Sequence, residues 1–247
     1  ESVRTDSKVD VFTLFSHYTR TDFITAGMKS EDYDKMINSE EPLDERWEIL
    51  KPFLQFIRYG SYARPAFIAL KEFYGFEEIT DENYREISEK MMSKNTPGIY
   101  KRILRDKCNI RVALTQAGRT DYDLDLLVPL MPLDNYARIG KAEDIHKRAE
   151  NLEMNVSELD DYIALVRKGV EKWKDEGAVG LKMASHPNNP PDRKAAEKAF
   201  NSVMSGDSSA NLNALHDFLT NKMLEIAADL DIVVAVHSGM WGDFRTL

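Results

Sequence analysis

The chain has 247 residues, of which 43% are hydrophobic, so it can bury the core of one large α/β domain or of two small ones. Its net charge of −9 argues against a surface for nucleic acid or for an anionic membrane. The single cysteine, Cys108, cannot form an internal disulfide, and no apolar run is long enough to span a bilayer. We therefore expect a cytoplasmic protein.

The first hundred residues predict helices. Polar cap residues and a glycine stop indicate short helical turns around residues 21–27 and 30–33, after a stretch over 9–18 that fits a short helix or a loop. Apolar residues at helical spacing predict longer helices over 44–58, 64–74, 80–92 and 96–108. Pro52 should kink or split the first of these. We expect the helical block 44–108 to be an insertion that caps a pocket or forms an oligomer interface.

From residue 109 onward, apolar runs alternate with long helices, which is the pattern of parallel β/α units. The last of these runs, Ile232 to Val236, is mostly β-branched and reads as a strand buried on both faces. The expected strands are 110–115, 126–131, 178–184 and 232–237, and the expected helices are 157–176, 192–204 and 211–229.

Polar residues stand at the ends of two predicted strands, the edge at which parallel α/β folds place their chemistry. Lys182 lies late in the third strand, either as a lysine whose head reaches solvent between helices or as a basic or carbamylated group at an active edge. His237 ends the fourth strand, either as a hydrogen-bonded strand-end histidine or as a metal ligand. We favour the ligand because imidazole is the commonest metal ligand and this is the edge where barrels present ligands.

Other candidate residues are less distinctive. His186 could join His237, but the proline-rich residues after it favour an exposed loop. His17 lies in an aromatic patch that lines either a substrate pocket or the core. Cys108 is expected to pack at a helix end. The acidic cluster 121–125 precedes a strand and is interpreted as a solvated loop. The sequence contains no glycine-rich phosphate loop and no G-x-S-x-G motif.

Several segments together resemble one family. Residues 232–239, preceded by Gly180-Leu181-Lys182, resemble the fourth and fifth strands of the metal-dependent amidohydrolase superfamily. Further segments are similar to its amidohydrolase-2 branch, which is related to uronate isomerases. Each motif is weak alone, and their order along the chain carries the resemblance. These segments are 14–18 with Asp22, 26–28, 62–65 and 97–100 with 104–105.

The resemblance implies an α/β fold of the (β/α)₈ TIM-barrel type, incomplete in this chain. Residues 1–247 would form a partial amidohydrolase-type barrel with strands 2–5 present, and 44–108 would be a helical insertion between strands 1 and 2. The His-x-His motif of strand 1 and strands 6–8 are missing, and the sequence does not begin with methionine. We therefore expect a fragment that is inactive by itself.

The resemblance also implies a site. His237 would bind a divalent metal, zinc in the first instance, and Lys182 would be catalytic. His17, Tyr18 and Arg20 would lie near the substrate. The implied reaction is metal-dependent hydrolysis of a C–N or ester bond in a small molecule, in which the metal lowers the pKa of a bound water to about 7.

Three alternatives stay open. The same barrel supports uronate isomerase-like chemistry on a sugar acid and non-oxidative decarboxylation of an aromatic acid. A relative without its metal would instead serve as a binding module. The expected partners are a small-molecule substrate and other copies of the chain in a homo-oligomer.

Overall fold

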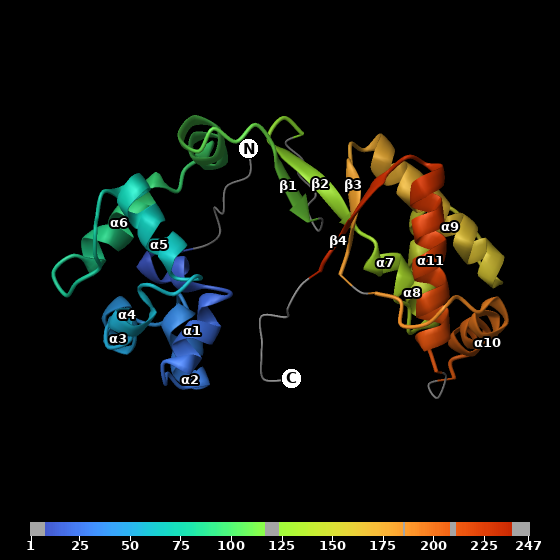
Figure 1. Ribbon diagram of the computed structural model, residues 1–247, viewed down its shortest axis with the longest axis horizontal. Helices are drawn as coiled ribbons and strands as arrows, with labels where there is room; N and C mark the ends of the chain where they lie inside the picture. Colours follow the sequence, from blue (N-terminus) through green and yellow to red (C-terminus); the bar gives the residue numbers. More distant parts are fainter. Residues whose placement is uncertain (1–7, 117–123, 185, 208–210, 239–247) are drawn as a thin grey trace. The chain divides into compact units, whose positions relative to one another are not determined.

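The structure is a computed structural model that describes residues 8–116, 124–184, 186–207 and 211–238. The described chain forms two compact units, shown in Figure 1: an N-terminal unit up to Ile103 and a sheet unit from Leu104 to residue 238. No helix among the described residues is long and apolar enough to cross a membrane.

The N-terminal unit is helical, as the sequence predicts. The expected break at Pro52 is confirmed, because α3 ends at Leu50 and α4 begins at Leu54. Its helices are η1 (Val11–Phe15), α1 (Thr19–Thr25), α2 (Ser30–Ile37), α3 (Leu43–Leu50), α4 (Leu54–Ile57), α5 (Arg64–Ala69), η2 (Leu70–Tyr74), α6 (Tyr84–Lys94) and η3 (Lys101–Lys107), the last of which runs into the sheet unit.

Several helix ends differ from the sequence prediction; η3, for example, begins at Lys101 rather than at Thr96. Helix α6 begins at Tyr84 rather than at Thr80, because the Thr80 amide donates to the Asn83 side chain at 2.7 Å and closes a turn before the helix. The expectation that Cys108 packs at a helix end is wrong: η3 ends at Lys107, and Cys108 follows it in an exposed turn.

The core of the N-terminal unit holds a buried ion pair. Arg46 donates to Asp10 at 2.6 Å, and the side chains are only 3% and 11% exposed. The same guanidinium donates from Nε to the Met36 carbonyl at 2.6 Å and lies over the Phe12 ring at 4.1 Å. Asp10 also caps η1 by accepting from the Phe12 amide. The pair therefore connects η1, α2 and α3.

The sheet unit contains, among the described residues, a four-stranded parallel sheet in the order β1-β2-β3-β4. This confirms the α/β class and all four predicted strands, each with its ends shifted by a few residues. The strands are β1 (Ala113–Gln116), β2 (Leu127–Pro132), β3 (Gly180–Met183) and β4 (Val233–Val236). The helices are α7 (Asp134–Ala137), α8 (Ala142–Asn151), α9 (Leu159–Asp175), α10 (Arg193–Met204) and α11 (Asn213–Asp229).

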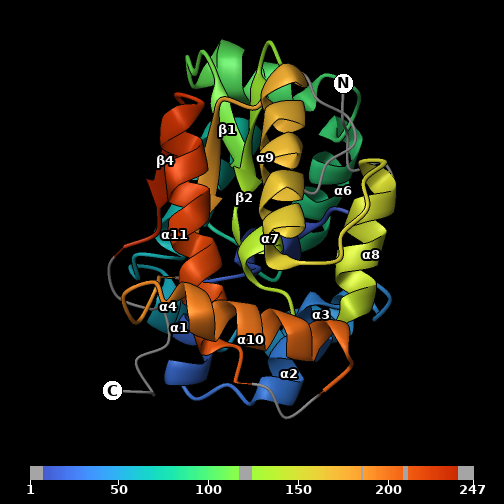
Figure 2. The same ribbon diagram turned by 90° about the vertical axis from the view of Figure 1, so that its right-hand side faces the viewer.

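Helices cover one face of this sheet. Met131, Leu181 and Met183 point into a core shared with the helices, and Figure 2 shows α9 and α11 running along the sheet. On the other face, Leu114 and Val233 are 60% and 71% exposed. The expectation that the fourth strand is buried on both faces is therefore wrong for β4, because it pairs only with β3 among the described strands and has helices on one side.

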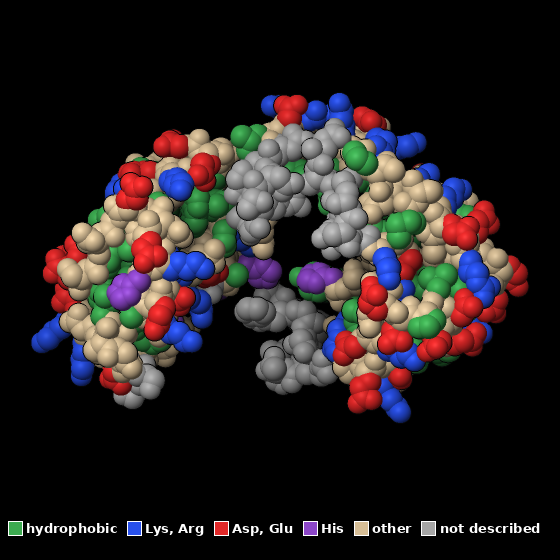
Figure 3. Space-filling model, turned by 180° about the vertical axis from the view of Figure 1, so that it is seen from behind, with side chains coloured by type: hydrophobic (Ala, Val, Ile, Leu, Met, Phe, Trp, Pro, Cys, Tyr) green, Lys and Arg blue, Asp and Glu red, His purple; other side chains and the backbone are tan. Residues whose placement is uncertain are grey.

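Charged side chains are distributed evenly on the face shown in Figure 3, where acidic and basic groups alternate over both units. Most ion pairs among the described residues are exposed, for example Arg85–Asp44 at 2.7 Å. Such pairs contribute little to folding because water screens them. The Asp10–Arg46 pair differs from these because it is buried, so its loss should affect the stability of the N-terminal unit.

Removing the guanidinium in Arg46→Gln should destabilise the N-terminal unit by about 3–5 kcal/mol, because it leaves the Asp10 carboxylate buried without its partner. Urea unfolding followed by circular dichroism measures this. The matched control is Arg85→Gln, which removes an exposed pair and should change stability little. Equal effects of the two variants would contradict a stabilising role for the buried pair.

Candidate active site

The carboxyl ends of β2, β3 and β4 meet at one edge of the sheet. In the register, Lys182 of β3 lies opposite Pro132 of β2 and opposite Ala235 of β4. The pairing continues past the strand ends, since the Leu133 amide donates to the Lys182 carbonyl at 2.9 Å and the His237 amide donates to the Met183 carbonyl at 2.8 Å. Residues just after each strand are therefore held close together.

Lys182 lies on the sheet face that carries no helices. Its neighbours Leu181 and Met183 point into the helix-covered core, so alternation directs Lys182 to the opposite face. The side chain is half-buried, and its ammonium makes no hydrogen bond or ion pair with the described residues. It is a cation available to a bound molecule at this edge.

Two histidines meet at the same edge. His186, which follows β3, places its Nε2 2.7 Å from the backbone carbonyl oxygen of His237, which follows β4. A carbonyl can only accept, so Nε2 of His186 carries the proton, and Nδ1 is the nitrogen that accepts a proton when the ring is neutral. Both residues are exposed. The structure thus brings the predicted His237 together with His186, for which the sequence favoured an exposed loop.

Asp134 is a site residue that sequence reasoning missed. It begins α7 directly after β2, and its Oδ2 accepts from the Ala184 amide at 3.0 Å. Its Oδ1 is buried and has no hydrogen-bond partner among the described residues. An acceptor left in that state costs free energy unless something donates to it. The position of Asp134, just past a predicted strand, was the signal that could have identified it.

Asp217 of α11 holds the loop that carries His186. Its carboxylate, in a residue only 3% exposed, accepts from the Asn188 amide at 2.8 Å, the Asn189 amide at 3.1 Å and the Asn189 side chain at 2.9 Å. Burial acts to raise the pKa of Asp217, but these hydrogen bonds and nearby His216 outweigh it, so the pKa lies below its ordinary value of 3.8.

The described residues do not fit a metal centre by themselves. No three His, Cys, Asp or Glu side chains in the described part of the chain lie close enough together to hold one ion. Two imidazoles and a lysine fall short of the three protein ligands that a catalytic zinc uses. A metal bound through His237 would need ligands from outside these residues.

The other predicted residues lie in the N-terminal unit. His17 adopts a left-handed backbone conformation (φ 66°), which is unusual for a residue with a side chain. Its ring contacts that of Tyr18 at 4.1 Å, and Tyr18 stacks on Tyr62 at 5.3 Å. Arg20 bonds to Ser30, lies 3.7 Å from Asp34 and packs over Tyr33. His17 and Tyr18 thus form an exposed aromatic surface, while Arg20 is engaged with α2.

Asp22 lies one turn after Tyr18 on α1. Its Oδ2 is buried without a hydrogen-bond partner among the described residues, and burial raises the pKa of its carboxyl group. A Cβ on Gly60 would lie 3.0 Å from that oxygen, a tight contact, so glycine suits the close approach of the chain there. Asp22 thus adds a carboxyl group with a raised pKa one turn from Tyr18.

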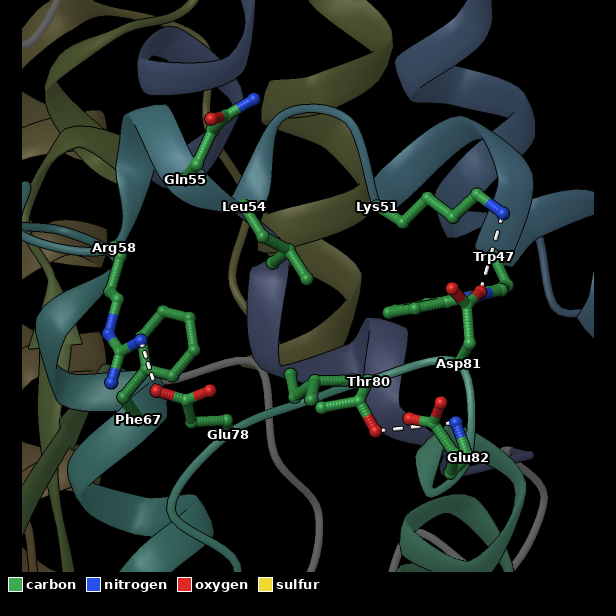
Figure 4. Close-up of a pocket in the computed structure, with 11 residues that line it drawn as sticks. Trp47, Lys51, Leu54, Gln55, Arg58, Phe67, Glu78, Thr80, Asp81 and Glu82 are labelled. Atoms are coloured by element: carbon green, nitrogen blue, oxygen red, sulfur yellow. Dashed lines mark hydrogen bonds and ion pairs between the residues drawn. The ribbon is translucent and has the colours of Figure 1, made fainter.

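The N-terminal unit also contains a cavity of about 410 Å³, shown in Figure 4. Trp47, Leu54 and Phe67 supply its apolar wall. Both of its cations are paired: Lys51 lies 3.3 Å from Asp81, and Arg58 pairs with Glu78 at 2.5 Å. Glu82 also lines the cavity, so the cavity offers an anionic ligand less than the sheet edge does.

Comparison with known proteins supports the fold. No family model and no curated protein sequence matches this chain. A uronate isomerase from Thermotoga maritima is similar over 92% of this chain and 54% of its own (TM-score 0.72, 16% identity). A glucuronate isomerase from Caulobacter crescentus is similar over 93% and 53% (TM-score 0.69, 17% identity). The chain spans about half the length of these isomerases, and at such identity the likeness establishes the fold alone.

Asp217→Asn should loosen the loop that carries His186. The amide presents a donor where three donors need an acceptor, so at neutral pH we expect a loss of about 1–3 kcal/mol in unfolding free energy. Because the folded pKa of Asp217 is lowered, its contribution is present above pH 3.8 and disappears as pH falls through the folded pKa. The difference from wild type should therefore shrink in acid.

Urea unfolding as a function of pH measures this effect. Asp229→Asn, an exposed position on the same helix, is the control and should show little change. A gap between Asp217→Asn and wild type that stays constant down to pH 3 would contradict the proposed hydrogen-bonding role of the carboxylate.

Proposed function

We propose that this chain is part of a (β/α)₈ sugar-acid isomerase and that the sheet edge carries its acid–base groups. The observation that supports this most directly is that Lys182 of β3 and the residues Asp134, His186 and His237, which follow β2, β3 and β4, lie at one edge of the sheet. Such edges hold the active sites of parallel α/β enzymes. The fold similarity to two uronate isomerases favours isomerisation over the hydrolysis expected from sequence.

The chemistry of isomerisation suits these residues. Converting an aldose into a ketose moves the C2 proton to C1 and the O2 hydroxyl proton to O1, so the enzyme needs a group that takes a proton from carbon and returns it, and a group that exchanges the oxygen-bound protons. A neutral imidazole does this near neutral pH, and His186 has Nδ1 available because Nε2 is committed to the His237 carbonyl. His237 is the second imidazole at this edge.

Lys182 has the complementary role. Proton abstraction next to a carbonyl places negative charge on the oxygen, and a half-buried ammonium near that oxygen stabilises the charge more than it would in water. The same cation attracts the carboxylate of a sugar acid. The roles of His17, Tyr18 and Arg20 in substrate binding remain predictions from the resemblance.

Metal-dependent hydrolysis is the second candidate. It is favoured by the position of His237 at a strand end, with Lys182 on the adjacent strand, the arrangement that the amidohydrolase resemblance predicts. Hydrolysis differs from isomerisation in its substrates, which are amides or esters rather than sugar acids. It also differs in the role of His237, which would be a metal ligand rather than a proton carrier. Activity assays therefore separate the two candidates.

We expect the protein that contains this chain to interconvert glucuronate and its ketose form. His186→Ala, His237→Ala and Lys182→Met should each lower kcat by about 10²-fold or more, because the first two remove an acid–base group and the third removes the charge that stabilises the oxyanion. Coupled spectrophotometric assays measure this. His146→Ala, at an exposed position of α8, is the matched control and should retain full activity.

Other outcomes are informative. Amide or ester hydrolysis without isomerisation, together with loss of bound zinc in His237→Ala, would replace the isomerase by the hydrolase. Full isomerase activity in His186→Ala, His237→Ala and Lys182→Met would show that the chemistry lies elsewhere, whichever reaction is catalysed.

A further inference from the structure

The helix layer of the sheet unit contains a pocket that shares no residue with the sheet edge. It has a volume of about 300 Å³ and lies between α7, α8 and α9. We call it the helix-layer pocket. Its polar and aromatic lining consists of Tyr136, Arg148, Asn151, Lys172, Trp173 and Glu176.

Tyr136 forms the inner wall of this pocket. The residue is only 7% exposed, its ring contacts Trp173 at 5.0 Å, and its hydroxyl makes no hydrogen bond with the described residues. The hydroxyl rests against the backbone of Gly169, where an added Cβ would lie only 2.1 Å from it. Burial raises the pKa of Tyr136, so the hydroxyl stays protonated and can donate at neutral pH.

Arg148 adds a second donor atom to the pocket. The residue is half-buried, its side chain interacts with the Tyr162 hydroxyl, and its guanidinium lies 6.0 Å from the Tyr136 ring centre. Its Nη1 is buried with no hydrogen-bond acceptor among the described residues. A buried donor normally has an acceptor, so an unpartnered Nη1 beside a cavity fits a ligand that supplies one.

The charges of the pocket favour a monoanion. Arg148 and Lys172 are cationic, and Glu176, 4.0 Å from Lys172, is the acid among the lining residues. The net charge of the lining side chains is therefore +1. A carboxylate matches the planar guanidinium fork and also accepts from a hydroxyl, whereas a dianion would be repelled by Glu176. The rings of Trp173 and Tyr136 suit a flat or apolar body.

We propose that the helix-layer pocket binds a small organic carboxylate, with the carboxylate on Arg148 and the Tyr136 hydroxyl and the body against Trp173. The volume is at the small end of ligand pockets, which limits the ligand to about the size of a single ring. This binding does not depend on the reaction at the sheet edge.

Calorimetric titration of the 247-residue chain with benzoate tests the proposal. We expect saturable one-site binding at millimolar concentrations or below. Benzamide, which has the same shape without the charge, should bind about tenfold more weakly or worse. Arg148→Gln should weaken benzoate binding to a similar degree, and Gly169→Ala should abolish it because the methyl group displaces the Tyr136 hydroxyl.

Two further variants make the result decisive. Lys147→Gln changes an exposed lysine next to Arg148 on α8 and should leave benzoate binding unchanged. Lys172→Gln, also at an exposed position, should weaken benzoate binding about threefold by removing one positive charge. This variant tests the charge requirement if Arg148→Gln does not fold. No saturable binding of benzoate, equal binding of benzamide, or unchanged binding in both Arg148→Gln and Lys172→Gln would each overturn the proposal.

Discussion

The pairing of β3 with a parallel strand on each side is the constraint on which the candidate site depends. Parallel strands all end at the same edge, so residues distant in sequence become neighbours without any direct attraction between their side chains. Lys182, Asp134 and His237 are brought together in this way. Gly180 shows how tight the pairing is, since an added Cβ would lie 2.9 Å from the Val233 carbonyl.

The unequal cover of the sheet explains why Lys182 can serve chemistry. A lysine in a strand between two helix layers would have to be paired or neutralised. Here the helices cover the face of Leu181 and Met183, and Lys182 shares the other face with the exposed Leu114 and Val233. A face that combines apolar residues with a central cation resembles the inside of a barrel, whose interior is filled by strand side chains. This favours the proposed (β/α)₈ architecture.

The elements of the sheet unit were predictable because their patterns are local. Apolar runs and amphipathic periods identify β2, β3, α9 and α11 from the sequence alone. The exposure of β4 was not predictable, since it depends on which strands and helices lie beside it. Asp134 was selectable in principle, because it stands just past a predicted strand. Asp217 could not be selected from 42 acidic residues, because its role comes from the amides of Asn188 and Asn189 that folding brings to it.

Helix α7 links the two sites of the sheet unit. It has only four residues, Asp134 to Ala137. Asp134 accepts from the amide that follows β3, and Tyr136 forms the wall of the helix-layer pocket, with its carbonyl fixed by the Tyr162 hydroxyl at 2.9 Å. The two side chains are two residues apart on this helix, yet they belong to different surroundings: Asp134 is held by the chain that follows β3, and Tyr136 is held by α9. The proximity of the two sites therefore follows from the shortness of the connection after β2, and binding at one site requires nothing of the other.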